Sequence, residues 1–268
     1  MRAMTTVIKE QFKNFYLIGR LSAYETKKEY ADSQLGMVWV FLNPLLQIAV
    51  YWFVFGAGIR KGHDVNHIPF LTWMLCGLIP WFYISAAILQ GSNSIYARLG
   101  TVSKMNFPLS IIPTYVVMSR FYTHLFLIIV LLIEVILTRG ISYISFWGLA
   151  YFAIANTILL IALSFLTSTL STMLRDIHLL IQSITRMLLY LTPILWVPNP
   201  HSKSLLVKLM KINPFYYIVE GYRKVLLYNE PAYILSKYSL YFWGVVIVLF
   251  IVGAAAHVKF RRQFVDYL

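Results

Sequence analysis

Apolar residues along this chain are concentrated in six long, almost uninterrupted stretches. The stretches cover residues 37–59, 69–90, 111–138, 147–174, 177–197 and 240–258. Each is about as long as, or longer than, the roughly 20 residues that a helix needs to cross the hydrocarbon core of a bilayer. The pattern therefore predicts an all-α membrane protein with six transmembrane helices.

The composition of the 268 residues fits this prediction. Hydrophobic residues make up 59% of the chain and charged residues 12%, and the mean hydropathy is +0.70. A soluble chain of this composition would carry extensive apolar surface. We expect a cytoplasmic interface region (1–36), a six-span domain (37–258) that includes an outer connection (198–239), and a cytoplasmic tail (259–268). None of the polar segments is long enough for a soluble catalytic domain.

Two local features bear on the cellular setting. The first 20 residues lack the compact apolar core and small-residue cleavage site of a secretory signal peptide, so we expect no removable leader. The single cysteine, Cys76, lies in an apolar stretch. An intramolecular disulfide is therefore excluded.

Lys and Arg residues in the connections predict the orientation of the spans. Six spans place both termini on one side, and that side carries 12 cationic residues against 9 on the other. We therefore expect both termini to be cytoplasmic. The long fifth connection weakens the asymmetry, because its basic residues meet either an anionic partner or lipid headgroups on the outer side.

Residues 5–20 show the pattern of an amphipathic helix. The apolar face carries Ile8, Phe12, Phe15 and Gly19, and the opposite face carries Lys9, Lys13 and Arg20. A helix of this kind lies in the membrane interface with its cations toward the headgroups. Membrane anchoring is the simpler interpretation, and docking of a cytoplasmic partner is the alternative.

Two connections are predicted to form short helices. On the cytoplasmic side, the connection at residues 91–110 is either a surface element that receives force from a cytosolic subunit or an ordinary interfacial loop. At its centre are Lys104, Met105, Asn106, Phe107 and Pro108. On the outer side, residues 204–212 can form one short helix. Asn213 and Pro214 can open a second that runs to about Tyr228. Both outer helices are too short to span, so we expect them to be re-entrant or interfacial.

Asn43-Pro44 is expected to interrupt the first span.

Arg120 and Arg186 lie well inside apolar sequence. A charge at membrane depth normally faces a partner or a watered cavity. Glu134 lies 14 residues after Arg120, about 21 Å along one helix, so these two cannot pair within it. An interhelical pair such as Arg186 with Glu134, or snorkelling, is one interpretation. Contact with a phosphate-bearing substrate is the other, since the guanidinium fork suits phosphate.

Signals for catalysis and metal binding are weak. His63 and His67 have i, i+4 spacing, but Gly62, Pro69 and the lack of a flanking glutamate favour a solvated loop. His124 has no evident triad partners. The chain contains no G-x-x-x-x-G-K-[ST] phosphate loop, so we predict no ATPase site, no catalytic residue and no metal or cofactor of its own.

Several segments, in order along nearly the whole chain, resemble the permease subunit of ABC-2-type (type V) exporters. They are Leu35–Trp39, Leu42–Pro44, Phe55–Arg60, Val102–Pro113, Arg175–Asp176, Pro193–Trp196 and Asn213–Arg223. The Asn-Pro, Glu-Gly-Tyr-Arg and Arg-Asp elements are similar to those of polysaccharide exporters in general, including O-antigen and capsule permeases. The Gly-Ile-Arg and Lys-Met-Asn-Phe-Pro elements look more like the wall teichoic acid branch from Gram-positive bacteria.

The resemblance implies a homodimer in a bacterial plasma membrane, bound to two copies of a separate ATPase that holds ATP and magnesium. Its cargo would be a polymer linked to undecaprenyl diphosphate, handled among membrane lipids, with no nucleic acid involved. Lys9, Lys13 and residues 104–108 would contact the ATPase. Candidates for the substrate path are Arg120, Arg186, Trp39, Phe41, Tyr51 and Tyr190, although each of the aromatic residues is equally well explained by packing or lipid contact.

Two other functional classes compete with an exporter subunit. A membrane-integral glycolipid transferase would need a buried cluster of His or carboxylate residues, which the sequence does not show. A passive channel or assembly scaffold is the third interpretation. ATP hydrolysis by a co-purified partner, stimulated by lipid-linked polymer, separates the three.

Overall fold

The structure is a computed structural model that describes residues 2–29, 31–59, 63–102, 107–197, 210–261 and 263–264. Five helical segments in this part are long and apolar enough to cross a membrane. They are α3 (Val38–Tyr51) with its π-helical continuation η1 (Trp52–Ile59), α4 (Phe70–Ser92), α6 (Ile111–Thr138), α7 (Phe146–Met173) and α11 (Lys237–Phe260). The prediction of an all-α membrane protein is confirmed, and five of the six predicted spans lie within three residues of these bounds.

The sixth predicted span, 177–197, differs from the helix that the structure contains. Helix α8 (Arg175–Leu191) has 17 residues, which corresponds to about 26 Å and falls short of the roughly 30 Å hydrocarbon core. It ends early because Thr192 precedes Pro193, which disfavours a helical conformation, and Thr192 is extended at φ −86° and ψ 133°. The predicted C-terminal end of this span, residue 197, was therefore wrong. A sixth crossing of the membrane stays a prediction.

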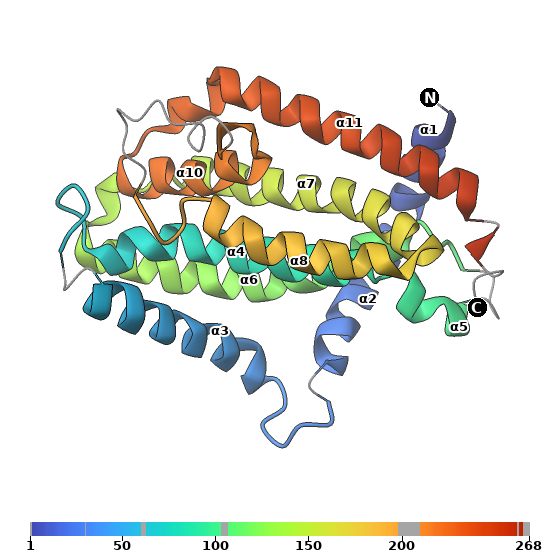
Figure 1. Cartoon of the computed structure of the whole chain (residues 1–268), viewed down its shortest axis with the longest axis horizontal. Coiled ribbons are helices and arrows are strands. Elements are labelled where there is room, and N and C mark those ends of the chain that lie inside the picture. Colours follow the sequence, from blue (N-terminus) through green and yellow to red (C-terminus); the bar gives the residue numbers. More distant parts are fainter. Residues whose placement is uncertain are drawn as a thin grey trace.

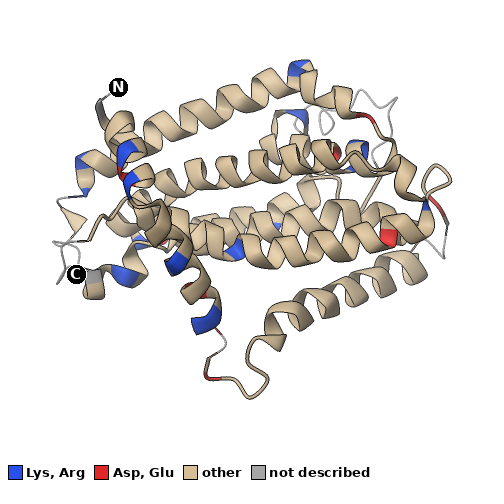
Figure 2. Ribbon diagram, turned by 180° about the vertical axis from the view of Figure 1, so that it is seen from behind, with Lys and Arg blue, Asp and Glu red and all other residues tan. Residues whose placement is uncertain are grey.

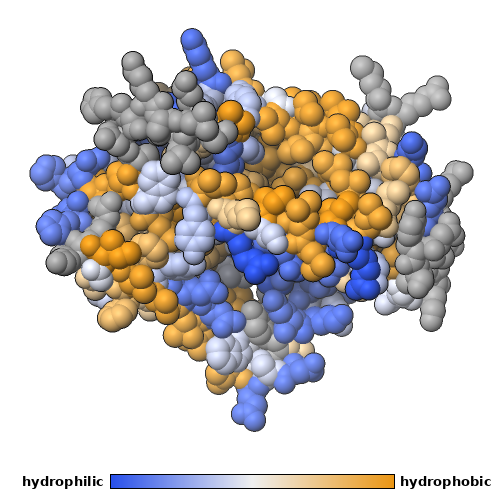
Figure 3. Space-filling model, in the orientation of Figure 1, coloured by the Kyte–Doolittle hydropathy of each residue, from blue (hydrophilic) through white to orange (hydrophobic). Residues whose placement is uncertain are grey.

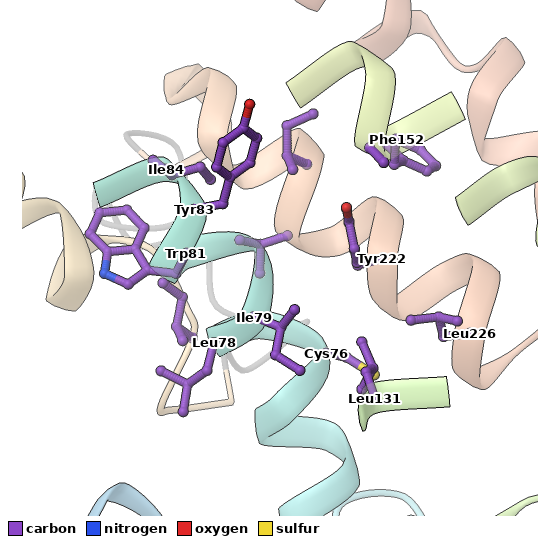
Figure 4. Close-up of a cluster of buried hydrophobic side chains, with 14 of the residues drawn as sticks. Cys76, Leu78, Ile79, Trp81, Tyr83, Ile84, Leu131, Phe152, Tyr222 and Leu226 are labelled. Atoms are coloured by element: carbon purple, nitrogen blue, oxygen red, sulfur yellow. The ribbon is translucent and has the colours of Figure 1, made fainter. Parts of the chain in front are cut away.

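Helix α4 is the centre of the bundle and packs against α6, α7, α8 and α10 (Pro214–Leu227) (Figure 1). Figure 4 shows its side chains meeting Leu131, Phe152 and Tyr222 from three other helices. On the other side of α7, Gly253 permits close packing of α11, since a Cβ there would lie 2.9 Å from the Leu166 backbone nitrogen. Apolar burial of this kind, together with close packing, holds the helices in one arrangement.

The predicted amphipathic helix 5–20 is two helices, α1 (Arg2–Lys13) and α2 (Phe15–Lys28), which meet at Asn14. Both cross the bundle rather than run along it (Figures 1 and 2). Phe12 and Phe15 are 78% and 76% exposed, as interfacial insertion requires, whereas Val7 and Ile18 are buried against the spans. The prediction of one continuous helix was therefore wrong. The face buried by packing, which carries Val7 and Ile18, also differs from the predicted apolar face.

Helix α3 lies at the edge of the bundle and diverges from it toward its N-terminal end (Figure 1). It continues through Pro44, so the predicted interruption was wrong. Membrane helices tolerate an internal proline where neighbouring groups can satisfy the freed backbone. His63 and His67 lie in the following loop, in which Val65 and Ile68 form an isolated β-bridge.

The predicted helix opened by Asn213 is confirmed as α10. The Asn213 side-chain oxygen accepts a hydrogen bond from the Phe215 amide at 3.0 Å, and Pro214 is the first helical residue. Helix α10 is packed against α4 and α7, as a short helix would have to be if it entered the membrane. The predicted helix at 204–212 lies largely outside the described residues.

Short turns complete the fold: η2 (Tyr96–Arg98), α5 (Leu99–Val102), η3 (Ile141–Tyr143) and η4 (Pro231–Leu235). Charged residues gather near the ends of the bundle and leave the spans almost free of them (Figure 2). An ion pair between Glu10 and Arg261, at 3.0 Å, joins α1 to the end of α11. Both terminal helices thus meet at one end of the bundle, although which side this end faces stays a prediction.

Candidate functional site

Two adjoining cavities form a groove along α4 and α6, with α3 bordering the first cavity and α2 and α8 bordering the second. The first, of about 340 Å³, lies among α3, α4 and α6. Its uncharged polar lining includes Asn43, Gln47, Ser85, Gln90, Thr123 and His124. The helices that form it are membrane spans. Amide and hydroxyl groups at this depth provide hydrogen bonds to a polar guest in an otherwise apolar environment.

The second cavity, of about 440 Å³, extends from the first toward the end of the bundle that carries α1 and α5. Its polar lining includes Lys28, Asn93, Arg98, His178 and Gln182. Figure 3 shows hydrophilic residues gathered between the bundle and the arm formed by α2 and α3, with apolar surface on either side. A polar route therefore leads from the edge of the bundle to the depth of the spans.

Arg120 and Glu29 stand where the two cavities meet. Both residues line both cavities, and the Arg120 Nη2 lies 2.5 Å from the Glu29 Oε2. The Arg120 side chain is 14% exposed, and its Nε has no hydrogen-bond partner among the described residues. The guanidinium is thus paired with Glu29 and borders both polar cavities, a position from which it can bind an anion.

The wall of the second cavity is fixed by contacts between helices. Arg98 pairs with Glu25, which joins η2 to α2. His178 on α8 lies 2.9 Å from the Ser92 hydroxyl through Nδ1 and 2.8 Å from the Gln182 amide through Nε2. These bonds tie α8 to the end of α4 and hold the polar side of α8 toward the groove.

His124 forms the buried side of the first cavity. Its Nε2 lies 2.8 Å from the Tyr222 hydroxyl, and its ring stacks on Tyr83 with centroids 4.8 Å apart. The Tyr83 hydroxyl donates to Thr157 at 3.2 Å. His124 on α6 is therefore hydrogen-bonded to α10 and stacked on α4, and the stacked Tyr83 is in turn hydrogen-bonded to α7. Sequence reasoning did not predict this cluster.

The structure separates the two predicted arginines. Arg120 lines the groove, whereas Arg186 is exposed on α8 and is not among the described residues that line either cavity. The Arg186 Nε donates to the Gln182 carbonyl of the same helix. The alternative pair of Arg186 with Glu134 is wrong, because Glu134 instead accepts a hydrogen bond from Thr72 at 2.9 Å. Glu29, the partner of Arg120, was not predicted from sequence.

None of the four predicted aromatic residues of the path is among the described residues that line the two cavities. Phe41 packs against Phe126 with ring centroids 4.3 Å apart, and Tyr51 lies 6.5 Å from Phe82. Trp39 is half-buried. Tyr190 is 65% exposed. Packing or lipid contact explains all four in this structure, and a role in the path stays a prediction.

The polar residues that line the groove left a signal in the sequence that the prediction did not use. Asn43 and Gln47 are spaced i, i+4 within an apolar helix, and so are His178 and Gln182. This spacing places each pair on one helix face. A polar pair on one face of a membrane helix indicates a cavity or a partner helix.

The residues predicted to contact a cytosolic subunit lie together as far as the structure describes them. Lys104, Met105 and Asn106 are outside the described residues. Phe107 packs against a small apolar cluster that includes Ile18 and Leu99 and is separate from the main core. Helix α1 is fixed to the same region, since Ser110 donates to Glu10 at 2.5 Å and Gln11 donates to the Ser110 carbonyl at 2.9 Å. Lys9 and Lys13 are exposed on this helix.

Arg223 on α10 is a buried cation that sequence reasoning did not single out as such. It is 2% exposed, its guanidinium lies 3.7 Å above the Trp73 ring, and its Nη2 donates to the Ile194 carbonyl at 3.2 Å. A Cβ on Gly77 would lie 2.9 Å from the same group. Burial lowers the pKa of the guanidinium, and the Glu220 carboxylate offsets this in part. Arg223 thus joins α10 to α4 and to the turn after α8.

Comparison with known proteins places the chain in context. Residues 16–227 match the family described as ABC-2 type transporter. The chain is 27% identical over 260 residues to an O-antigen export system permease protein RfbA of Klebsiella pneumoniae, covering 95% of each chain. It is 26% identical over 231 residues to the protein of that name from Myxococcus xanthus, covering 83% of this chain and 84% of that one. These relatives do not support the narrower resemblance to teichoic acid permeases, whereas the alternative resemblance to O-antigen permeases fits them.

Proposed function

The chain belongs to the ABC-2 type transporter family, and from this premise we propose that it exports a polymer linked to undecaprenyl diphosphate. Members of the family are membrane subunits of transporters and are not themselves the ATPase. The ATP and magnesium would therefore be held by a partner ABC ATPase. This assignment agrees with a multi-pass chain of five long apolar helices and makes a transferase or passive channel unnecessary.

The observation that carries the proposal is the position of Arg120 between two polar cavities at the edge of the spans. A lipid-linked polymer presents a diphosphate next to sugar hydroxyls. A guanidinium is well suited to the phosphate oxygens, and the Asn43, Gln47 and Gln90 amides of the first cavity are suited to the hydroxyls. One groove thus offers both kinds of recognition in adjoining positions.

We further propose that the working unit is a homodimer with two ATPase subunits in a bacterial plasma membrane, with both termini cytoplasmic. The first cavity is bordered by α3, which contacts the bundle only weakly. Five or six helices are too few to enclose a wide polymer path. A second copy would supply the missing wall and leave the groove shielded from lipid.

Two polymers are candidates for the cargo. The Gly-Ile-Arg and Lys-Met-Asn-Phe-Pro segments favour wall teichoic acid, by resemblance alone. The names of the relatives from Klebsiella pneumoniae and Myxococcus xanthus favour an O-antigen type of polysaccharide. Both share the diphosphate-lipid group that Arg120 would bind, so the proposal for the groove is independent of the polymer.

The test is to reconstitute the chain with its ATPase in lipid vesicles and to measure ATP hydrolysis with each undecaprenyl diphosphate-linked polymer. We expect hydrolysis only when the ATPase is present, because the chain has no phosphate loop. We expect stimulation by one polymer class above the other. Hydrolysis by the purified chain alone, or hydrolysis that no lipid-linked polymer stimulates, would contradict the proposal.

A second prediction concerns the cytoplasmic connection. Replacing Phe107 with Asp places a charge in an apolar cluster, at a cost on the order of 2 kcal/mol. We expect loss of the complex with the ATPase, or loss of coupling, while the spans stay folded because the main core is a separate cluster. Co-purification of the ATPase and thermal unfolding of the chain measure the two effects.

The control for this prediction is Phe107→Leu, which keeps an apolar side chain and should retain the complex. A Phe107→Asp variant that assembles and transports normally would show that the connection at residues 104–108 does not transmit force from the ATPase.

A further inference from the structure

The ion pair between Arg120 and Glu29 lies at the junction of the two cavities. Glu29 stands at the end of α2, before the turn that leads to α3. Glu29 follows the final residue of α2 and has helical dihedral angles, φ −57° and ψ −31°. Two other polar contacts hold α2 against α6: the Thr26 hydroxyl donates to the Ser119 carbonyl at 3.1 Å, and the Ser22 and Tyr122 hydroxyls are 3.1 Å apart. Glu29 is therefore presented to Arg120 by a helix that is already docked.

The fixed position of Glu29 determines which other anions can reach Arg120. The two cavities share only Glu29, Leu89, Gln90 and Arg120 among the described residues that line them. An anion that enters through the second cavity meets the guanidinium at the edge now occupied by the Glu29 carboxylate. Carboxylate and phosphate oxygens use the same donors of an arginine in the same fork geometry, so the two compete for one site.

The exposures of the two side chains indicate an exchangeable pair. The Arg120 side chain is 14% exposed, and that of Glu29 is 30% exposed. Glu29 can therefore turn toward water when it is displaced, whereas Arg120 stays in a largely dehydrated position and needs another anion. A buried cation without a partner is costly, so the arrangement favours exchange of one anion for another over simple opening of the pair.

We infer that Glu29 is the resident ligand of Arg120 and is exchanged for the phosphate of the lipid-linked substrate. The inference rests on the proposed function, because it takes Arg120 as the phosphate-binding residue. It adds that Glu29 pairs with Arg120 when no substrate is bound. The apparent affinity for the substrate is therefore lower the larger the fraction of time for which Glu29 holds the guanidinium. A phosphate group displaces the carboxylate, and an uncharged lipid does not.

The test is the affinity of the full chain, in lipid nanodiscs, for undecaprenyl diphosphate and for undecaprenol, which has no phosphate. Glu29→Gln should tighten the binding of undecaprenyl diphosphate roughly tenfold if Glu29 occupies the site about 90% of the time. The affinity for undecaprenol should not change. Glu29→Asp, which keeps the charge on a shorter side chain and keeps the chain folded, should give a smaller gain in the same direction.

Two further variants separate competition from a general charge effect. Glu10→Gln removes the same charge from a glutamate that is also paired with an arginine, at 3.0 Å, and that lines neither cavity among the described residues. It should leave both affinities unchanged. Combining Glu29→Gln with Arg120→Gln should give the affinity of Arg120→Gln alone, because the competition requires the guanidinium.

The outcomes distinguish this inference from the proposed function. If Arg120→Gln weakens the binding of undecaprenyl diphosphate but neither Glu29 variant tightens it, the exchange is wrong and the phosphate site stands. If Glu10→Gln gives the same gain as Glu29→Gln, the effect is one of net charge and the exchange is again wrong. If Arg120→Gln binds as tightly as the unmodified chain, both the exchange and the phosphate site are wrong.

Discussion

Replacing Arg120 with glutamine is expected to abolish most of the stimulation of the partner ATPase by lipid-linked polymer. Charge-assisted hydrogen bonds contribute about 1.5–3 kcal/mol, which corresponds to roughly a 10–100-fold loss of apparent substrate affinity. Arg120→Lys should fall between, because lysine keeps the charge and loses the bidentate fork. Substrate-stimulated ATPase activity in reconstituted vesicles measures both variants.

The structure supplies a matched control within the same class of residue. Arg186 also lies in a strongly apolar region of the sequence, yet it is exposed and is not among the described residues of either cavity. Arg186→Gln should therefore leave stimulation within about twofold of the unmodified complex, since removal of an exposed cation that has no ion-pair partner among the described residues changes little. Equal losses at both positions, or losses that follow thermal unfolding, would rule out a specific phosphate site at Arg120.

Arg223→Met is expected to cause the largest loss of stability among the changes considered. It removes a guanidinium stacked over Trp73 in a dehydrated site and leaves the Ile194 carbonyl without its donor. The two effects together should cost about 3 kcal/mol of the free energy of unfolding. Thermal unfolding in detergent measures the loss, and binding of the ATPase should persist in the fraction that stays folded.

The neighbouring cation provides the comparison. Lys224 forms an ion pair with Glu230 at 2.8 Å, but the two side chains are 29% and 52% exposed. Exposed pairs of this kind contribute about 0–1 kcal/mol, so Lys224→Met should lower the unfolding temperature far less than Arg223→Met. Equal effects would mean that Arg223 does not fix α10 to α4.

The elements that sequence predicted well are those with a local physical cause. The helix opened by Asn213 and Pro214 forms at the expected residues because its cap and its first turn depend only on neighbours in the chain. The early end of α8 had a local cause as well, the proline at 193, which the hydropathy of 177–197 obscured. Asn14 shows the opposite case, since α1 and α2 separate there where packing against two different helices, α11 and α6, requires it.

The candidate site was predicted only in part, because its residues come from distant positions. Arg120 was identified from its cost in an apolar span, but Glu29 lies 91 residues earlier and carries no sign of the pairing. Ser92 and His178, which are 86 residues apart, are likewise joined only in the folded chain. The choice between Arg120 and Arg186 depends on which helix face meets a cavity, and hydropathy does not report that.

The sequence by itself determined that this chain is a helical membrane protein and where five of its long helices lie. The reason is that a bilayer requires about 20 consecutive apolar residues and a backbone hydrogen-bonded within each segment, and both conditions are met locally. Only the tertiary structure decided that α3 borders a polar cavity, that Glu29 forms an ion pair with Arg120, and that the Arg223 side chain is buried. These features arise from the packing of helices distant in sequence, where the position of each side chain is set by its neighbours in space.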